Sequence, residues 1–279
     1  MNQRSIWRTL WLIVGLLFLY LPLVYVILYS FNSSRLMTVW AGFSFKWYGA
    51  LLHDDVLMGA VWMSLRVALM AATLAAIFGI MAAFVLARIG RFRGENGFAL
   101  MITAPLVMPD VIMGLSLLLM FVFMGQWLGF PAQRGMLTIL IAHVTLCTAY
   151  VTVIVSARLR ELDRSVEEAA LDLGATPLKV FFTITLPMMM PAVVSGWLLA
   201  FTLSLDDVVI ASFVSGPSST TLPMVIFSSV RLGISPKINA LATLFILVVA
   251  VTAFMAWWLI SRSEKRRSQA LRQHGLKVI

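Results

Sequence analysis

Long apolar runs dominate the chain. Seven of them contain no Asp, Glu, Lys or Arg, and they cover residues 9–34, 67–87, 111–133, 135–157, 180–205, 208–230 and 238–261. A helix needs about 20 apolar residues to cross the hydrocarbon core of a bilayer. Each run is long enough, so the pattern predicts an all-α integral membrane protein.

The run over 208–230 differs from the others. Gly216-Pro217 lies at its centre, and the apolar pieces on either side are too short to span. Broken backbone at membrane depth must be buried in protein or line a cavity. We therefore expect a re-entrant or surface-lying hairpin at 208–230. The six predicted spans lie at about 9–31, 61–87, 98–125, 135–157, 181–205 and 238–261.

Positive charges favour six spans over seven. Of the 21 Lys and Arg residues, 15 then fall on the side that holds both termini, including a basic tail at 262–279. Cytoplasmic loops carry the excess of Lys and Arg. Both termini are therefore predicted to be cytoplasmic, and a seventh span would place the basic tail outside.

Composition supports this interpretation and narrows the function classes. Hydrophobic residues make up 61% of the chain and charged residues only 12%, which excludes a disordered protein and is atypical of a soluble enzyme. The formal net charge of +9 does not indicate a nucleic-acid binder, because so few polar residues separate the charges. Cys147 is the single cysteine, so an intrachain disulfide and a multi-cysteine metal site are excluded.

The cytoplasmic segment 158–182, between the fourth and fifth spans, has the features of a built loop. Ser165 and Glu168 have the spacing of a capping box, and Gly174 is placed to end the helix in a left-handed conformation. Thr176-Pro177 then predicts the start of a second helix. The first helix is expected to run from Val166 to Leu173. Its predicted apolar face carries Val166, Ala169, Ala170 and Leu173, and its other face carries Glu167, Glu168 and Asp172.

So short a helix is not stable alone in water, and it should therefore be docked on something. Two interpretations remain open from the residues themselves. The helix either docks on another protein, whose cations would suit its carboxylates, or rests as a solvated loop helix on its own bundle.

The spacing of residues in this loop resembles a known signature. Glu168 opens an E-A-A sequence, Gly174 follows after three residues, and an I-x-L-P sequence follows after nine more. This pattern resembles the signature loop of the permeases of binding-protein-dependent ABC importers, the MetI-like family. In that family the loop forms a coupling helix that fits a groove on a separate ATPase subunit. The resemblance assigns Glu168, Ala169, Ala170, Leu173 and Gly174 to the coupling helix and Ile184, Leu186 and Pro187 to the loop end.

Further segments resemble the permeases of polyamine importers, particularly the putrescine branch over Ala104–Asp110 and Glu161–Asp207. The resemblance implies a multi-pass protein of the bacterial inner membrane that transports putrescine or spermidine. Its implied partners are a second permease, two ATP-binding subunits, a periplasmic polyamine-binding protein and membrane lipid. No lysine follows a glycine, so the chain lacks a phosphate-binding G-K pair. We expect no catalytic residue or cofactor on this chain, and ATP and Mg on the partner ATPase.

Three carboxylates are candidates for the substrate pathway. Asp206 and Asp207 end the fifth span just before the broken hairpin, where a cation could replace its water with carboxylate partners. Asp110 is predicted near mid-depth in the third span, where an acidic residue costs about 2.5–3.5 kcal/mol. Asp110 alternatively serves as a structural partner of Arg66 or of backbone freed by Pro105 and Pro109. The alternative for the other two is ordinary interfacial charge.

Other candidates are weaker. His143 and Cys147 lie one helical turn apart, but two ligands do not make a metal site, and packing is the expected role. An importer for another solute and an autonomous secondary transporter remain rival functions. An intramembrane hydrolase is disfavoured because neither G-x-S-x-G nor H-E-x-x-H is present.

Overall fold

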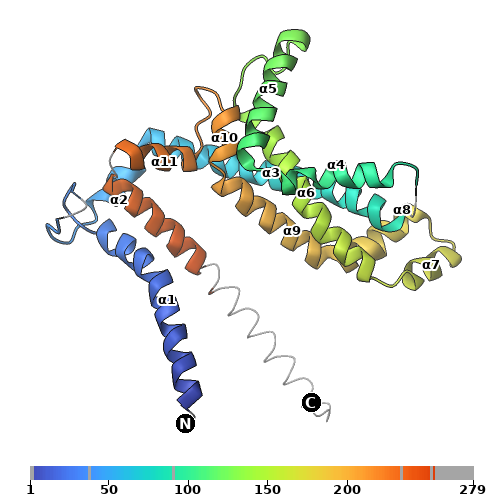
Figure 1. Cartoon of the computed structure of the whole chain (residues 1–279), viewed down its shortest axis with the longest axis horizontal. Coiled ribbons are helices and arrows are strands. Elements are labelled where there is room, and N and C mark those ends of the chain that lie inside the picture. Colours follow the sequence, from blue (N-terminus) through green and yellow to red (C-terminus); the bar gives the residue numbers. More distant parts are fainter. Residues whose placement is uncertain (1–2, 37–38, 90–91, 233–234, 252–253, 255–279) are drawn as a thin grey trace. The chain divides into compact units, whose positions relative to one another are not determined.

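The computed structural model describes residues 3–36, 39–89, 92–232, 235–251 and 254, and the basic tail at 262–279 lies outside them. Helices joined by short loops make up most of this part of the chain (Figure 1). Two units are distinguished, one from residues 1–55 with 229–279 and one from residues 56–228.

The first unit contains α1 (Gln3–Ser30), α2 (Lys46–Leu52) and the helix Pro236–Val251. A buried asparagine, Asn32, organises the loop after α1. Its Nδ2 donates to the Val39 carbonyl at 2.8 Å, and its Oδ1 accepts from the Ala41 N–H at 2.9 Å. Trp47 Nε1 donates to the Asn32 carbonyl at 2.7 Å and so fixes α2 to the same residue.

The second unit holds the longest helix, α3, and the residues that the sequence singled out as site candidates. Its elements are α3 (Asp55–Arg88), α4 (Glu95–Val107), α5 (Asp110–Leu128), α6 (Met136–Glu161), α7 (Ser165–Asp172), α8 (Pro177–Val180), the π-helix η1 (Phe181–Thr185), α9 (Leu186–Asp206), α10 (Val209–Val214) and the first part of α11 (Leu222–Leu232).

Small residues allow the long helices of this unit to pack closely. One face of α3 consists largely of buried alanines, and α6 lies along α9 (Figure 1). Val151 of α6 lies between two glycines, Gly79 of α3 and Gly196 of α9. A Cβ at Gly79 would meet Val151 Cγ1 at 2.6 Å, and a Cβ at Gly196 would meet it at 3.4 Å. Close approach through glycine and alanine is the usual packing mode of helices in membranes.

The predicted third span over 98–125 is not one helix. It is divided into α4 and α5, which separate at Met108 and Pro109 and point in different directions (Figure 1). The ring of Pro109 disfavours the helical conformation of Met108, whose φ and ψ are −75° and 134°. Pro105 alone does not break α4, which runs through it. The sequence predicted one span with backbone groups freed at its two prolines, and the structure has a complete break.

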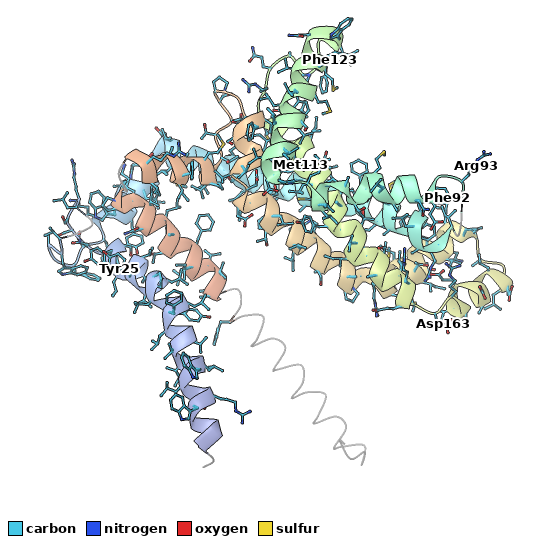
Figure 2. The ribbon with its side chains drawn as sticks, in the orientation of Figure 1. Tyr25, Phe92, Arg93, Met113, Phe123 and Asp163 are labelled. Carbon is cyan, nitrogen blue, oxygen red and sulfur yellow. The ribbon has the colours of Figure 1, made fainter. Side chains whose placement is uncertain are left out.

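The C-terminal part of α5 extends beyond the neighbouring helices. Met113, near the start of α5, is buried among other helices, whereas Phe123 is exposed on the projecting part (Figure 2). An exposed apolar surface of this kind needs lipid or protein to cover it in a membrane.

Five helical stretches of the described residues are long and apolar enough to cross a membrane. They correspond to α1, α3, α5, α6 and the continuous stretch Pro177–Asp206. The predicted spans at 9–31, 61–87, 135–157 and 181–205 each overlap one of these stretches along nearly their whole length, and four of the five stretches are longer than the span predicted there or begin earlier. The sixth predicted span begins in the helix Pro236–Val251, and its remainder extends beyond the described residues except for residue 254. Six therefore stays a prediction.

The predicted hairpin at 208–230 contains two short helices, α10 and α11. Ile210, Ala211 and Val214 of α10 are fully buried, and α10 packs on α5 and α6. Gly114 of α5 makes room for this contact, since a Cβ there would lie 2.7 Å from the Phe213 ring. This part of the broken segment is thus buried in protein rather than lying on the surface.

Candidate functional site

A side-chain hydrogen bond marks the start of the loop helix α7, and a left-handed glycine marks its end. At its start, the Ser165 N–H donates to Asp163 Oδ1 at 2.9 Å, and this hydrogen bond lowers the pKa of the Asp163 carboxyl. The predicted capping box between Ser165 and Glu168 is absent, because α7 already includes Ser165 and Asp163 supplies the acceptor. At its end, Gly174 has a φ of 85°, and the Ala175 N–H reaches the Ala170 carbonyl at 3.1 Å. The left-handed glycine cap is confirmed.

A buried ion pair joins α7 to the rest of the bundle. Glu167 Oε2 lies 3.1 Å from Arg88 Nε, and the two side chains are only 17% and 6% exposed. Arg88 is the last residue of α3, and its Nη2 also donates to the Leu162 carbonyl at 3.4 Å. Thr185 Oγ1, in the last residue of η1, donates to Glu167 Oε1 at 2.9 Å. One carboxylate therefore connects α7, α3 and the start of α9.

Glu167 does not belong to the outward face to which the sequence pattern assigned it. Arg88 draws its carboxylate inward, and no local pattern could show this because the two residues are 79 positions apart. The apolar residues of the predicted docked face are instead accessible. Val166 and Ala169 are exposed, and Leu173 is 90% exposed. The helix thus holds a charge against its own bundle and leaves apolar side chains outside.

Glu168 is exposed beside Ala169, and Ala170 is half-buried. The loop then continues through α8, which Pro177 begins as predicted, into η1 and α9 without interruption. The Leu186 N–H bonds to the Phe181 carbonyl, five residues back, just before Pro187. Proline removes a donor from the helix and clashes with the preceding turn, and the wider π-turn accommodates that. Ile184 and Leu186 are half-buried, and Pro187 is exposed.

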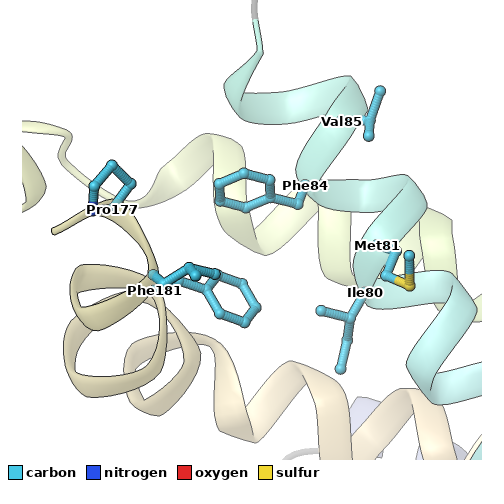
Figure 3. A pocket seen from close by; sticks show the side chains of 7 residues that line it. Ile80, Met81, Phe84, Val85, Pro177 and Phe181 are labelled. Atoms are coloured by element: carbon cyan, nitrogen blue, oxygen red, sulfur yellow. The ribbon is translucent and has the colours of Figure 1, made fainter.

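An apolar cavity of about 350 Å³ lies where this segment meets α3 (Figure 3). Phe84 and Phe181 are adjacent in its lining and in edge-to-face contact, with ring centroids 5.4 Å apart. The cavity is lined by Ile80, Met81, Phe84, Val85, Pro177, Leu178 and Phe181.

The two adjacent carboxylates at the end of α9 differ in their surroundings. Asp207 is largely buried, and its carboxylate accepts from the Ala211 N–H at 2.7 Å and the Ile210 N–H at 3.2 Å. It therefore caps the start of α10. Its Oδ2 also lies 3.2 Å from His143 Nε2. Asp206, the last residue of α9, is exposed and has none of these contacts.

His143 has polar partners on two other elements, contrary to the packing role expected for it. Its Nδ1 lies 2.7 Å from Ser204 Oγ, and the side chain is almost fully buried. Cys147, one turn further, donates to the Ala200 carbonyl at 3.4 Å. Sequence reasoning missed this network because the partners of His143 lie 61 and 64 residues later. A histidine inside an apolar span was the one available signal.

Asp110 is the first residue of α5 and is exposed, rather than lying in the middle of a span. A carboxylate at a helix N-terminus is favoured by the helix dipole. No ion pair joins Asp110 to Arg66, both of which the structure describes, and the Arg66 guanidinium lies 4.6 Å from the centroid of the Trp62 ring. Of the three candidate pathway carboxylates, the structure brings together only Asp206 and Asp207.

Residues 75–269 match the family described as binding-protein-dependent transport system inner membrane component. Over 264 residues the chain is 67% identical to the putrescine transport system permease protein PotI of Escherichia coli (strain K12), with 95% of this chain and 94% of that protein covered. Over 246 residues it is 44% identical to the spermidine/putrescine transport system permease protein PotC of Haemophilus influenzae, with 88% and 93% covered.

The fold is similar to those of solved ABC transporters. A chain of a bacterial ABC transporter involved in the import of the acidic polysaccharide alginate matches with a TM-score of 0.69 at 17% identity, covering 92% of this chain and 95% of that one. A chain of the MetNI methionine ABC transporter matches with a TM-score of 0.54 at 18% identity, covering 77% and 95%. The expected all-helical fold of MetI-like permeases is confirmed.

Proposed function

We propose that this chain, which belongs to the binding-protein-dependent transport system inner membrane components, is the membrane-spanning permease subunit of an ATP-driven polyamine importer. The observation that carries the proposal is the 67% identity to PotI, a putrescine permease, over nearly the whole length of both proteins. Putrescine is accordingly the first substrate to test and spermidine the second. Both are small cations.

The coupling function is assigned to α7. This helix has eight residues, too few to be stable by itself, yet the ion pair of Glu167 with Arg88 holds it in place. The exposed Leu173 and Ala169, next to the Glu168 carboxylate, then form a surface suited to a groove on a separate ATP-binding subunit. ATP and Mg would be held there and not on this chain. The other proposed partners are a second permease and a periplasmic polyamine-binding protein.

The substrate pathway is assigned to the end of α9. A protonated amine leaving the binding protein must exchange its water for carboxylate or aromatic partners. Asp206 is exposed at this point and offers such a partner. Asp207 is adjacent but is already bound to the start of α10, and Asp110 remains a further candidate at the start of α5. Alternating access would pass movement from α7 to the packing around Pro187–Pro191, with both termini on the cytoplasmic side.

The test is complementation of an E. coli strain that lacks PotI. The chain, tagged at one end, is expressed there, and uptake of radiolabelled putrescine and spermidine is measured. Copurification from mild detergent reports assembly with the resident ATPase and second permease. We expect putrescine uptake to return together with the complex. If the complex assembles but neither polyamine is taken up, the substrate assignment is wrong. Purification of the chain alone would overturn the assignment as a permease subunit.

A further inference from the structure

A polar network lies within the apolar seam between α6 and α9. His143 of α6 is nearly fully buried, Ser204 of α9 is 5% exposed, and the Asp207 side chain is 10% exposed. Polar groups buried in a membrane-spanning bundle are costly unless each has a partner. Here each does, at 2.7 Å for Ser204 and 3.2 Å for Asp207.

The contacts of Asp207 indicate the direction of its hydrogen bond with His143. The Asp207 carboxylate already accepts from two backbone N–H groups of α10, and an ionised carboxylate can only accept. His143 Nε2 therefore carries a proton and donates to Asp207. Nδ1 accepts from the Ser204 hydroxyl when the ring is neutral and donates to the Ser204 oxygen when the ring is protonated, so the contact joins α6 to α9 in both forms. Because Ser204 is buried and Asp207 is engaged with α10, the three side chains join helices and do not expose a nucleophile.

The other end of α10 is also held by the beginning of α6. Thr138 Oγ1 donates to the Val214 carbonyl at 2.6 Å, and Arg134 Nη1 donates to the Phe213 carbonyl at 3.3 Å. A Cβ at Gly216 would clash with the Arg134 backbone, so the chain passes very close there. Both ends of α10 are thus fixed to the α6 segment, by His143 through Asp207 and by Thr138 directly. The turn that displays Asp206 lies between α9 and this fixed helix.

We propose that His143 is a positioning residue for the import pathway. It holds the Asp207 side chain in place at the start of α10, and Asp206 is thereby left as the carboxylate that meets the cationic substrate. This inference depends on the proposed polyamine pathway. It assigns different roles to two neighbouring acids that the sequence alone makes equivalent. The network positions Asp206 by fixing the neighbouring Asp207 and the start of α10, and His143 does not itself contact substrate.

Two substitutions at one position separate the two contacts of His143. In His143→Gln the terminal amide reaches the place of Nε2 and can still donate to Asp207. In His143→Asn the shorter amide reaches only the place of Nδ1, towards Ser204. Each variant is tested in the PotI-deficient strain by putrescine uptake against concentration, with copurified ATPase as the measure of assembly. Thr145→Val is the matched control on α6, because the Thr145 hydroxyl bonds only to the Ile141 carbonyl of its own helix.

We expect His143→Asn to raise the KM for putrescine about tenfold, the effect of one lost hydrogen bond to a charged group, with assembly unchanged. His143→Gln and Thr145→Val should stay close to the unaltered chain. In an Asp206→Asn background, His143→Asn should add little further loss, because both substitutions act on one contact. Equal loss in His143→Gln and His143→Asn, or full additivity with Asp206→Asn, would overturn the inference.

The design also separates this inference from the function on which it depends. If Asp206→Asn alone leaves putrescine uptake unchanged, the pathway assignment fails first, and the positioning role fails with it. If Asp206→Asn impairs uptake while the His143 variants behave additively, the pathway stands and only the role of His143 is wrong.

Discussion

The ion pair between Glu167 and Arg88 gives the sharpest prediction about coupling. Glu167→Gln keeps the shape of the side chain and an oxygen that can accept from Thr185, but it removes the charge that faces Arg88. Breaking a buried pair by removing one partner costs about 3–5 kcal/mol. The carboxylate is 17% exposed, so we take the lower end, about 3 kcal/mol.

Hydrogen exchange measures this loss directly. At about 1.4 kcal/mol for each factor of ten, a loss of 3 kcal/mol corresponds to roughly 150-fold faster exchange of the α7 amides. The matched control is Glu168→Gln, which changes the exposed neighbour and should leave exchange within α7 unaltered. Copurification of the ATPase should fall for both variants, in one case because the helix opens and in the other because its outer surface changes.

A charge swap completes the argument. Arg88→Glu combined with Glu167→Arg restores opposite charges at the same two positions and should recover much of the protection that either single change loses. Unchanged exchange in Glu167→Gln, or a swap no better than its single variants, would show that the ion pair does not hold α7.

Three further predictions concern packing, the loop turn and pH. Gly79→Leu should overpack the contact with Val151 and destabilise the bundle by about 1–3 kcal/mol, seen as a lower Tm in detergent, whereas Gly97→Leu, which has open space around it, should not. Gly174→Ala places a side chain at a φ of 85° and should cost about 1–2 kcal/mol, measured as faster α7 exchange, with Gly174→Asn milder; equal exchange in all three would refute the cap. Because the pKa of Asp163 is lowered, its hydrogen bond to Ser165 stabilises α7 fully above the ordinary carboxyl pKa and is lost as pH falls through the folded-state value. Protection of the α7 amides from hydrogen exchange, corrected for intrinsic exchange, should therefore decline at acid pH in the unaltered chain. The decline should be much smaller in Asp163→Asn.

Local features of the loop over 158–182 were predictable from the sequence, and distant partnerships were not. Gly174 could be placed as a left-handed cap because glycine tolerates that conformation and the preceding pattern is helical. The inward turn of Glu167 depends on Arg88, at the end of a helix far earlier in the chain. Its direction is therefore a tertiary property that a helical periodicity cannot show.

The same distinction applies to the pathway. The charge-free runs identified the long apolar helices, but the third predicted span, 98–125, passed through Pro109, where steric exclusion of helical backbone at Met108 divides the segment. Asp206 and Asp207 looked alike as neighbours in sequence. Only the fold, which brings His143 and the start of α10 to Asp207, distinguishes them.

The continuous helical stretch Pro177–Asp206 has a mechanical consequence. Its 30 residues extend about 45 Å from the loop that holds α7 to the carboxylate proposed to meet the substrate. Such a rod acts as a lever, and the π-turn before Pro187 is where it can bend. A movement at one end of this helix is transmitted to the other end, and thermodynamic linkage makes the coupling between two binding events reciprocal. Binding of a cation at Asp206 should therefore change the affinity of the distant ATPase for α7. The ATPase should change the affinity for the cation by the same factor.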